Sequence, residues 1–293
     1  MKILITGGTG FLGSKLVRKL IEDGHSLTLI LRETSDMRRL LPVQGLFDFF
    51  FSQSDDYDTY FQKADGFDVI IHCATNYGRA GVSLTKVLED NLVWPIRLLE
   101  LCIKYGCKLF INTDTFFAKK DTDYYYLREY ILSKILLRKA LVSYSSLINI
   151  ANMRLEHVYG PEDSPDKFTP WIVTQLLSSI NMLDMTSGVQ KRDFIYLDDV
   201  VNAYICLLHN KGRIRGFREY EVGTGESYSI REFVELVKYE LKSNTNLQWG
   251  VLPMRENEFM DSKANIANLK ELGWAPTFSL QEGIKKLIDY YRN

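Results

Sequence analysis

The sequence predicts an α/β fold, in which a doubly wound parallel sheet is joined by a smaller, interleaved α/β lobe. Three observations predict this fold. The chain opens on an apolar strand that runs into a glycine-rich turn and then a helix. Strand-like apolar runs then alternate with helical patterns through the first half, as a parallel sheet with right-handed crossovers requires. After Tyr159-Gly160-Pro161 the chain is rich in loops and prolines, which indicates where the second lobe begins.

The opening segment has the features of a phosphate cradle. Residues 3–5 form the apolar strand, and residues 14–23 carry apolar side chains at helical spacing. Between them, Gly7, Gly10 and Gly13 allow a tight turn and a close approach of the backbone to a phosphate. The helix N-terminus then offers free N–H groups and the positive end of its dipole. This order is the context of a dinucleotide-binding fingerprint and predicts a Rossmann domain, with a tight turn that binds no ligand as the alternative.

The remaining elements follow in alternation. We expect further strands at 27–31, 47–51, 67–73, 108–112, 147–154 and about 220–223, and helices at 84–105, 124–144, 197–209, 230–241 and from Leu280. From this order of elements we expect residues 1–157 and roughly 192–223 to form a dinucleotide-binding domain. Residues 158–191 and roughly 224–293 would form a substrate lobe.

Length and composition narrow the function classes. The 293 residues, 46 % of them hydrophobic, suffice for a large core, and a net charge of −1 argues against nucleic acid as a partner. No apolar run of membrane-spanning length and no signal-peptide pattern occurs, so we expect a cytoplasmic protein without a membrane partner. The four cysteines lack CxxC spacing, which predicts reduced thiols and no metal site.

A second group of residues carries chemistry. The strand at 108–112 leads into Thr113 and Asp114, and Tyr130 and Lys134 follow four residues apart on one face of a helix. A nearby ammonium lowers the pKa of a tyrosine from about 10, so that it can exchange a proton with a substrate oxygen near neutral pH. The alternative is that Tyr130 only packs and Lys134 is solvated.

Further motifs accompany these two. The set comprises Gly7-x-x-Gly10-x-x-Gly13, Ile71-His72-Cys73-Ala74, Asn91, Thr113, Tyr130-x-x-x-Lys134, residues 154–161, residues 192–200 and Leu272-Gly273-Trp274. Together they resemble the extended short-chain dehydrogenase/reductase family over essentially the whole chain. Within it, residues 112–121 and 152–160 most resemble the CDP-abequose and CDP-paratose synthases, the 4-ketoreductases that complete CDP-3,6-dideoxyhexoses for bacterial O-antigen lipopolysaccharide.

This resemblance implies reduction of a 4-keto sugar nucleotide. Tyr130 would protonate the sugar O4, Lys134 would hold the nicotinamide ribose and lower the pKa of Tyr130, and Thr113 would stabilise the developing alkoxide. The resemblance also implies cofactor contacts from Gly7, Thr9, Gly10, Phe11, Leu12, Gly13, Ala74, Thr75 and Asn91.

One departure from the family bears on the reaction type. Sugar-nucleotide dehydratases of the family carry an Asp-Glu pair after the threonine, but here Asp114 is followed by Thr115. Because elimination needs an acid and a base, this change counts against a dehydratase. Asp114 then contacts the substrate, or it only caps a turn.

The end of the second strand bears on the choice of nicotinamide. An acidic residue there would bind the adenosine 2′-hydroxyl, but Leu31 occupies that position. Arg32 follows and can pair with a 2′-phosphate, whereas Glu33 argues the other way. We therefore expect NADPH, with NADH as the alternative.

By the same resemblance, basic residues in loops would bind a nucleotide sugar. Arg192 and Arg255 would hold its pyrophosphate, and Glu258 would accept a ribose hydroxyl. Phe168 would lie against the base, beside Lys167. Surface charges are the alternative for both arginines.

Glu156 and His157 replace a Phe-Asn pair that is common in the wider family. They end the strand at 147–154 where the nicotinamide and sugar would meet. Both are candidate substrate contacts, and a structural histidine is the alternative for His157.

Two other functions are compatible with the same motifs, and the family resemblance also implies an assembly state. A nucleotide-sugar 4-epimerase or dehydratase with tightly bound NAD would share the fold, and a cofactor-sensing binding protein without catalysis is the remaining alternative. In many relatives the tyrosine-bearing helix and the long helix before it form a dimer interface, so we expect a homodimer.

Overall fold

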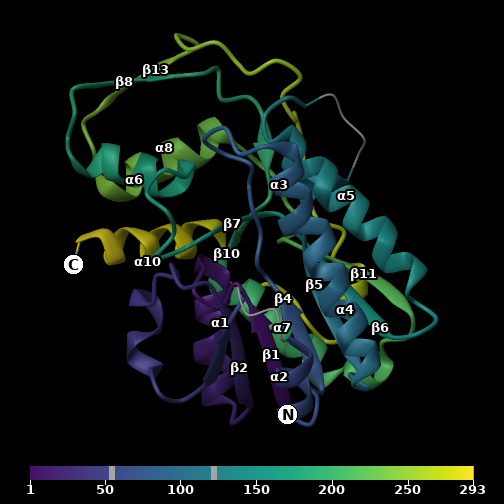
Figure 1. Cartoon of the computed structure of the whole chain (residues 1–293). Coiled ribbons are helices and arrows are strands. Elements are labelled where there is room, and N and C mark those ends of the chain that lie inside the picture. Colours follow the sequence, from purple (N-terminus) through teal and green to yellow (C-terminus); the bar gives the residue numbers. More distant parts are fainter. Residues whose placement is uncertain (53–56, 120–123, 293) are drawn as a thin grey trace. The chain divides into compact units, whose positions relative to one another are not determined.

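A seven-stranded sheet organises the first half of the chain (Figure 1). Its strands are β1 Lys2–Thr6, β2 Ser26–Leu31, β3 Asp48–Phe51, β4 Val69–His72, β5 Leu109–Thr115, β6 Asn149–Leu155 and β11 Phe217–Val222. They lie in the order β11-β6-β5-β4-β1-β2-β3, and the pairs β1–β2, β1–β4, β2–β3 and β4–β5 are parallel. The order from β3 to β6 is that of the Rossmann fold, which confirms the predicted fold class.

The computed structural model describes residues 1–52, 57–119 and 124–292. The last two positions of the motif at 112–121 therefore lie outside the described residues. The chain falls into two compact units: one comprises Met1–Asp121, Leu127–Arg154 and Tyr204–Tyr220, and the other Thr122–Tyr126, Leu155–Ala203 and Glu221–Asn293.

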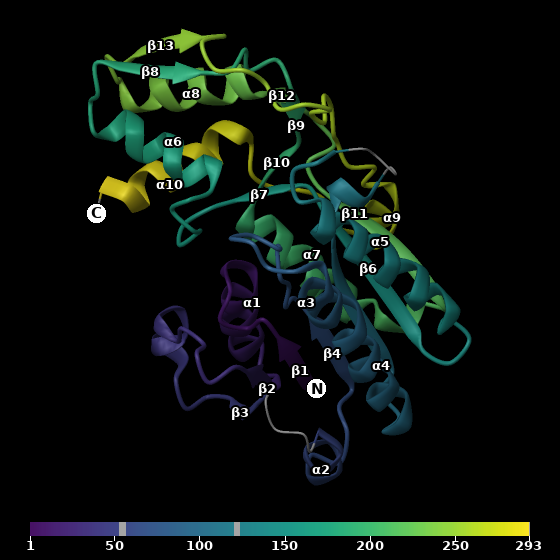
Figure 2. The same ribbon diagram turned by 45° about the horizontal axis from the view of Figure 1, so that its top comes forward.

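The central strands are buried on both faces. Every residue of β4 is buried, as are Ile3, Leu4 and Ile5 of β1. Such continuous apolar runs are typical of parallel strands covered on both sides, and they are the reason that the sequence located these strands correctly. The helices of this unit are α1 Phe11–Glu22, α2 Tyr57–Lys63, α3 Leu84–Leu88, α4 Trp94–Lys104 and α5 Arg128–Ser143, and α3 and α4 lie beside α5 (Figures 1 and 2).

The helix expected at 84–105 is interrupted by a π-helical turn at Glu89–Val93. Pro95 explains the interruption, because it lacks the N–H that would bond to the carbonyl of Asn91 in an α-helix. The wider turn places Asn91 with its side chain buried. π-turns of this kind are frequent at functional sites.

Helix α5 begins later than the sequence suggested. Leu127 has a left-handed backbone with φ of +65°, so the helix begins at Arg128 rather than at Tyr124. The segment Tyr124–Tyr126 packs with the second unit instead. Tyr130 thus lies in the first turn of α5.

The second unit combines three short strand pairs with helices. Its strands are β7 His157–Tyr159, β8 Met182–Met185, β9 Lys191–Arg192, β10 Phe194–Tyr196, β12 Tyr228–Ser229 and β13 Asn246–Trp249. Its helices are α6 Phe168–Leu177, α8 Ile230–Leu241, α9 Ala267–Glu271 and α10 Leu280–Arg292, and α7 Leu197–His209 runs from this unit into the first. Figure 2 shows the pair β8–β13 beside α8.

Aromatic rings form much of the core of this unit. The rings of Phe194 and Phe233 stack with centroids 4.2 Å apart, and Tyr159 meets both edge-on. A capping box between Ser229 and Glu232 begins α8 where the sequence predicted it.

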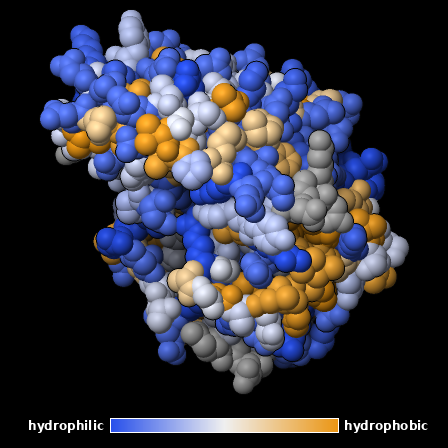
Figure 3. All heavy atoms as spheres, turned by 90° about the horizontal axis from the view of Figure 1, so that it is seen from above, coloured by the Kyte–Doolittle hydropathy of each residue, from blue (hydrophilic) through white to orange (hydrophobic). Residues whose placement is uncertain are grey.

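Two surface properties complete the description. Within the described ranges, none of the helices combines the length and the apolarity that crossing a bilayer would require. Apolar side chains interrupt the polar surface in several places on the face shown in Figure 3.

Candidate active site

The glycine turn leaves no room for side chains. Gly7 has φ of +70°, and a Cβ there would lie 2.6 Å from the Ala74 nitrogen. A Cβ on Gly13 would lie 2.1 Å from the Gly7 carbonyl oxygen. Gly10 caps α1 with no side-chain hydrogen bond, and the first turn of α1 holds no acidic residue. The turn and the helix N-terminus therefore fit the pyrophosphate of a dinucleotide.

A buried pair braces this turn from behind. The Thr6 hydroxyl lies 2.8 Å from His72 Nδ1, and the Ala74 N–H donates to the same hydroxyl at 3.2 Å. The Thr6 hydroxyl thus links the His72 ring to the backbone at Ala74. Burial lowers the pKa of His72 to about 3. Thr6 ends the first strand and was not expected at the site, because no motif marks it.

Asn91 ties the loop after β4 to α5. Its Oδ1 accepts from the Asn76 N–H at 2.7 Å, and its Nδ2 donates to the Asn76 carbonyl at 2.7 Å and to Ser133 Oγ at 3.0 Å. The Thr75 hydroxyl donates to Oδ1 at 3.4 Å. Asn91 and Thr75, both expected at the cofactor, thus lie together beside the turn of α5 that carries Lys134.

The structure brings together the three residues expected to be catalytic. Lys134 Nζ lies 5.9 Å from the centroid of the Tyr130 ring and donates to the Thr113 carbonyl at 2.8 Å. Tyr130 is 5 % exposed and Lys134 is 3 % exposed. Burial of this kind lowers the local dielectric and strengthens the electrostatic interactions between the three residues.

The pKa of Tyr130 differs from the sequence expectation. Burial raises the pKa of Tyr130 well above its ordinary value, and Tyr77, whose ring lies 4.9 Å away, raises it further. A hydrogen bond with Thr115 acts in the opposite direction. Burial also lowers the pKa of Lys134, against the raising influence of Asp114. The expected lowering of the Tyr130 pKa is therefore corrected: burial dominates the environment of the phenol and keeps it protonated at neutral pH.

The hydroxyl of Thr113 has two protein neighbours. It lies 2.8 Å from the hydroxyl of Tyr204, and it donates to Cys73 Sγ at 3.3 Å. Tyr204 lies on α7 and was not expected at the site, because no motif connects it with Thr113 across ninety-one residues.

Asp114 points into the protein. Its Oδ1 accepts from the Thr115 N–H at 2.8 Å, and its Oδ2 accepts from Asn152 Nδ2 at 2.8 Å. Both oxygens therefore have protein donors, and the carboxylate fixes the end of β5. Asn152 is fully buried and was not expected at the site.

Two arginines that follow β2 in the chain are candidates for a cofactor contact. Arg32 is exposed directly after the buried Leu31. Arg38 is held in a bidentate bond by Asp36, whereas Arg39 donates to the Thr9 carbonyl at 3.3 Å. Arg32 and Arg39 are thus placed beside the predicted dinucleotide site.

In the second unit, two of the expected substrate residues bind each other. Arg192 and Glu258 form an ion pair at 2.6 Å, and each side chain is 7 % exposed. The guanidinium of Arg255 lies 3.8 Å from the centroid of the Tyr126 ring and donates to the Tyr124 hydroxyl at 3.4 Å. The two arginines expected to bind phosphate are therefore held in fixed positions by neighbouring side chains.

Lys167 and Phe168 are also engaged within this unit. Lys167 forms an ion pair with Asp163 at 2.8 Å. The ring of Phe168 lies 6.0 Å from that of Phe233 and packs against the aromatic core.

Glu156 and His157 are enclosed by the same unit. Both oxygens of Glu156 accept from the Ser262 hydroxyl, at 3.0 and 2.8 Å. The His157 ring meets Phe194 edge-on at 5.0 Å, and burial lowers the pKa of His157 to about 3.

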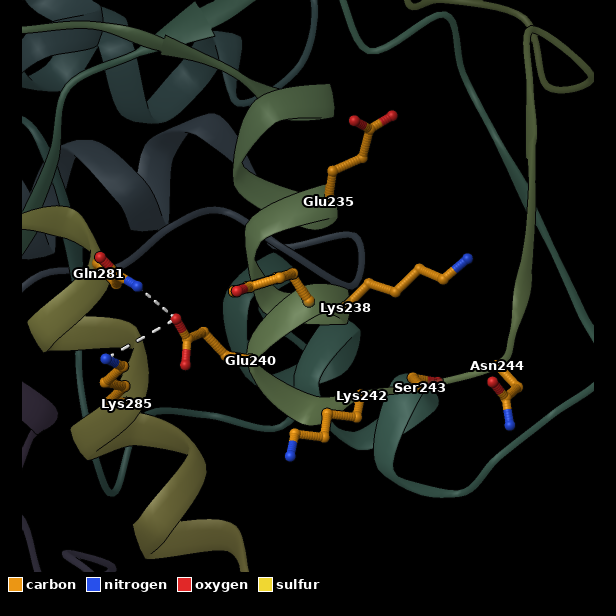
Figure 4. A pocket seen from close by; sticks show the side chains of 9 residues that line it. Glu235, Lys238, Glu240, Lys242, Ser243, Asn244, Gln281 and Lys285 are labelled. Carbon is orange, nitrogen blue, oxygen red and sulfur yellow. Dashed lines mark hydrogen bonds and ion pairs between the residues drawn. The ribbon is translucent and has the colours of Figure 1, made fainter.

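The hollow shown in Figure 4 lies between α8 and α10 and is lined mainly by charged side chains. Glu240 accepts from Gln281 at 2.6 Å there, and Lys285 lies 3.9 Å from it. None of the residues expected at a functional site lines it. Across the described ranges, no group of three or more His, Cys, Asp or Glu side chains is arranged to hold a metal ion.

A Rossmann sheet with a tyrosine–lysine pair beside a strand-end threonine defines a nicotinamide-dependent oxidoreductase site. Comparison with known proteins agrees, because the model of the NAD dependent epimerase/dehydratase family matches residues 3–223. The chain belongs to that family, and it is an enzyme that uses a nicotinamide cofactor.

Similar proteins extend over the whole chain. The CDP-abequose synthase of Salmonella typhimurium is 36 % identical over 295 residues, which covers 98 % of this chain and 97 % of the relative. The CDP-abequose synthase of Salmonella muenchen is 37 % identical, with the same coverage.

Solved structures share the fold. The UDP-glucose 4-epimerase of Thermotoga maritima, solved with UDP-glucose, has a TM-score of 0.85 at 24 % identity and covers 100 % of this chain and 99 % of its own. The dTDP-glucose 4,6-dehydratase of Bacillus anthracis, solved with NAD, has a TM-score of 0.84 at 20 % identity, with coverage of 100 % and 96 %.

Proposed function

We propose that this enzyme is an NADPH-dependent 4-ketoreductase that acts on a CDP-4-keto-3,6-dideoxyhexose. The observation that carries the proposal is the meeting of Tyr130, Lys134 and Thr113 in one enclosed site, in a chain similar over its full length to CDP-abequose synthases. The substrate class is taken from these relatives and the reaction type from the site. The product would serve O-antigen lipopolysaccharide synthesis.

Different residues of the first unit would bind the cofactor and donate the proton. The glycine turn, Asn91 and Lys134 would hold the dinucleotide. When bound, the nicotinamide supplies a hydride to C4 of the sugar. Tyr130 then donates its proton to O4, so that the ketone takes up one hydride at C4 and one proton at O4 and becomes an alcohol. The Tyr130 phenolate regains its proton from solvent.

The environment of Tyr130 suits this direction of reaction. A phenol whose pKa is raised by burial is protonated at neutral pH, which is the form that a proton donor needs. Thr115 supports reduction rather than elimination, because a threonine hydroxyl cannot serve as the base that the dehydratase glutamate provides.

Arg32 supports NADPH over NADH. It follows β2 at the position where a 2′-phosphate would lie, and the acid that would repel this phosphate is replaced by the buried Leu31. Arg39, at the glycine turn, adds positive charge to the same region.

In the second unit we assign the pyrophosphate to Arg192 and Arg255, and a ribose hydroxyl to Glu258. The ion pair between Arg192 and Glu258 supports the assignment, because it holds the guanidinium in place before a phosphate arrives. Arg255 is similarly held by the Tyr126 ring. Phe168 beside Lys167 would lie near the base, and Glu156, His157 and Asp114 are assigned to the surroundings of the sugar.

Two further properties are part of the proposal. Val93, Leu132 and Val142 are exposed apolar side chains on α5 and on the helical run before it, and they support a homodimer through these helices. The four cysteines, all within the described ranges, form no disulfide with one another, which supports a reducing, cytoplasmic location.

The test is incubation with CDP-4-keto-3,6-dideoxyglucose and NADPH, or NADH, followed by NMR of the product. We expect a 3,6-dideoxyhexose with a new hydroxyl at C4 and one NADP⁺ released for each sugar reduced. A protein that is purified with tightly bound NAD and interconverts 4-epimers without added cofactor would instead be an epimerase.

A further inference from the structure

The hydroxyl of Thr113 occupies a defined place in a short hydrogen-bonded chain. It lies between the Tyr204 hydroxyl at 2.8 Å and Cys73 Sγ at 3.3 Å. All three residues belong to the first unit, at the carboxyl ends of β4 and β5 and on α7.

The direction of these hydrogen bonds follows from the number of protons. A threonine hydroxyl carries one proton and can also accept. Its proton points to Cys73 Sγ, so the bond of 2.8 Å must be donated by Tyr204. Burial raises the pKa of Tyr204 well above its ordinary value, so this phenol keeps its proton at neutral pH.

We propose that Tyr204 is a positioning residue for the reduction, which aims the proton of Thr113 at the substrate O4. The donation from Tyr204 occupies the Thr113 oxygen on one side, so that the Thr113 proton must point away from α7. In the absence of substrate, sulfur accepts this proton only weakly. An oxygen that gains negative charge during reduction is a far stronger acceptor and takes it over.

This inference rests on the proposed function, because it needs a substrate oxygen beside Thr113. It also explains why a phenol lies in an apolar interior. Tyr204 is 0 % exposed, and a phenylalanine would fill the same space without a polar atom to satisfy. The Thr113 oxygen is the hydrogen-bonding partner that the structure shows for this hydroxyl.

Tyr204→Phe tests the inference. The variant keeps the ring and removes only the donated hydrogen bond, so that the Thr113 hydroxyl can rotate. We expect kcat for the keto sugar to fall about 10- to 100-fold, somewhat less than for loss of a direct oxyanion donor, while KM changes little. Tyr159→Phe is the matched control: Tyr159 is equally buried and also donates one hydrogen bond, to the Leu280 carbonyl, but in the other unit.

The same substitution in a Thr113→Val background separates positioning from stability. If Tyr204 acts through Thr113, then Tyr204→Phe lowers kcat less than about 2-fold once the threonine hydroxyl is gone. Equal losses in both backgrounds would show that the tyrosine supports only the fold. Thermal unfolding of each variant checks that the proteins compared are folded.

The outcomes also distinguish this inference from the function on which it rests. A wild-type enzyme that reduces no CDP-4-keto sugar overturns both. An active wild type with an unchanged Tyr204→Phe variant overturns the positioning role alone and leaves the reductase intact.

Discussion

Lys134 donates a hydrogen bond of 2.8 Å to the carbonyl oxygen of Thr113, which ties α5 to the end of β5. The bond fixes the ammonium beside the Tyr130 ring and anchors the strand end that carries the Thr113 hydroxyl. One lysine therefore contacts both Thr113 and Tyr130, the two residues to which we assign the chemistry of the reduction.

Removal of the Lys134 ammonium is expected to lower kcat strongly. Lys134→Met keeps the length of the side chain and loses the charge, so that kcat falls by about 100-fold or more. Steady-state kinetics with the keto sugar measures the loss. Lys139→Met, near the C-terminal end of the same helix, is the control, and a similar loss there would argue against a specific role for Lys134.

Tyr130 is expected to impose a characteristic pH dependence. Because its pKa is raised, the acid form is present across the neutral range, and kcat/KM for reduction is flat from pH 7 to about 9 and falls only above the ordinary tyrosine pKa of about 10. A decline that begins near pH 7 would show that the lysine dominates instead. Tyr130→Phe lowers kcat by about 100- to 10,000-fold.

The choice of nicotinamide is tested at Arg32. Arg32→Ala raises KM for NADPH roughly 10- to 100-fold and leaves KM for NADH unchanged, because only NADPH carries the 2′-phosphate. Arg38→Ala is the matched control, since Asp36 already holds that guanidinium. Equal effects on both cofactors would contradict the assignment of Arg32.

Substitution of Gly13 by alanine tests whether the glycine turn binds the dinucleotide. Gly13→Ala places a Cβ 2.1 Å from the Gly7 carbonyl oxygen, so that the turn must open, and NADPH affinity falls at least about 10-fold in a titration. Gly212→Ala, with no atom within 4 Å of the added Cβ, is the control. Unchanged affinity in Gly13→Ala would place the dinucleotide elsewhere.

Two buried histidines make the fold sensitive to acid. The pKa values of His72 and His157 are lowered to about 3, below the value of about 6.5 in the unfolded chain. Between these values the unfolded state binds the protons, so each histidine lowers the free energy of unfolding by about 1.4 kcal/mol for each unit that the pH falls below 6.5. Urea unfolding at pH 7 and pH 5 measures the sum.

A variant separates the contribution of one histidine. His72→Asn removes one group that gains a proton on unfolding, and the difference between the two pH values becomes smaller. His209→Asn, at an exposed position, serves as the control. An identical pH dependence in His72→Asn would mean that His72 does not titrate in this way.

The sequence located those elements whose pattern is local. The apolar strands of the sheet, the glycine turn and the capped helix α8 each follow from adjacent residues, because burial on both faces, tight turning and N-capping are encoded within a few positions. The short strands β8, β9 and β13 were not predicted. The four-residue strand β4 was located because it is part of a continuous apolar run, whereas β8, β9 and β13 contain polar residues and carry no such signal.

By itself, the sequence determined the fold class, the glycine turn and the spacing of Tyr130 and Lys134, because each depends on residues that are near one another in the chain. Only the tertiary structure decided how these residues behave. It buried Tyr130 so that desolvation raises the pKa of its phenol, turned Asp114 toward Asn152, and brought Tyr204 within hydrogen-bonding distance of Thr113. Burial and the pairing of distant residues arise when the sheet and its helices assemble, and no local pattern records them.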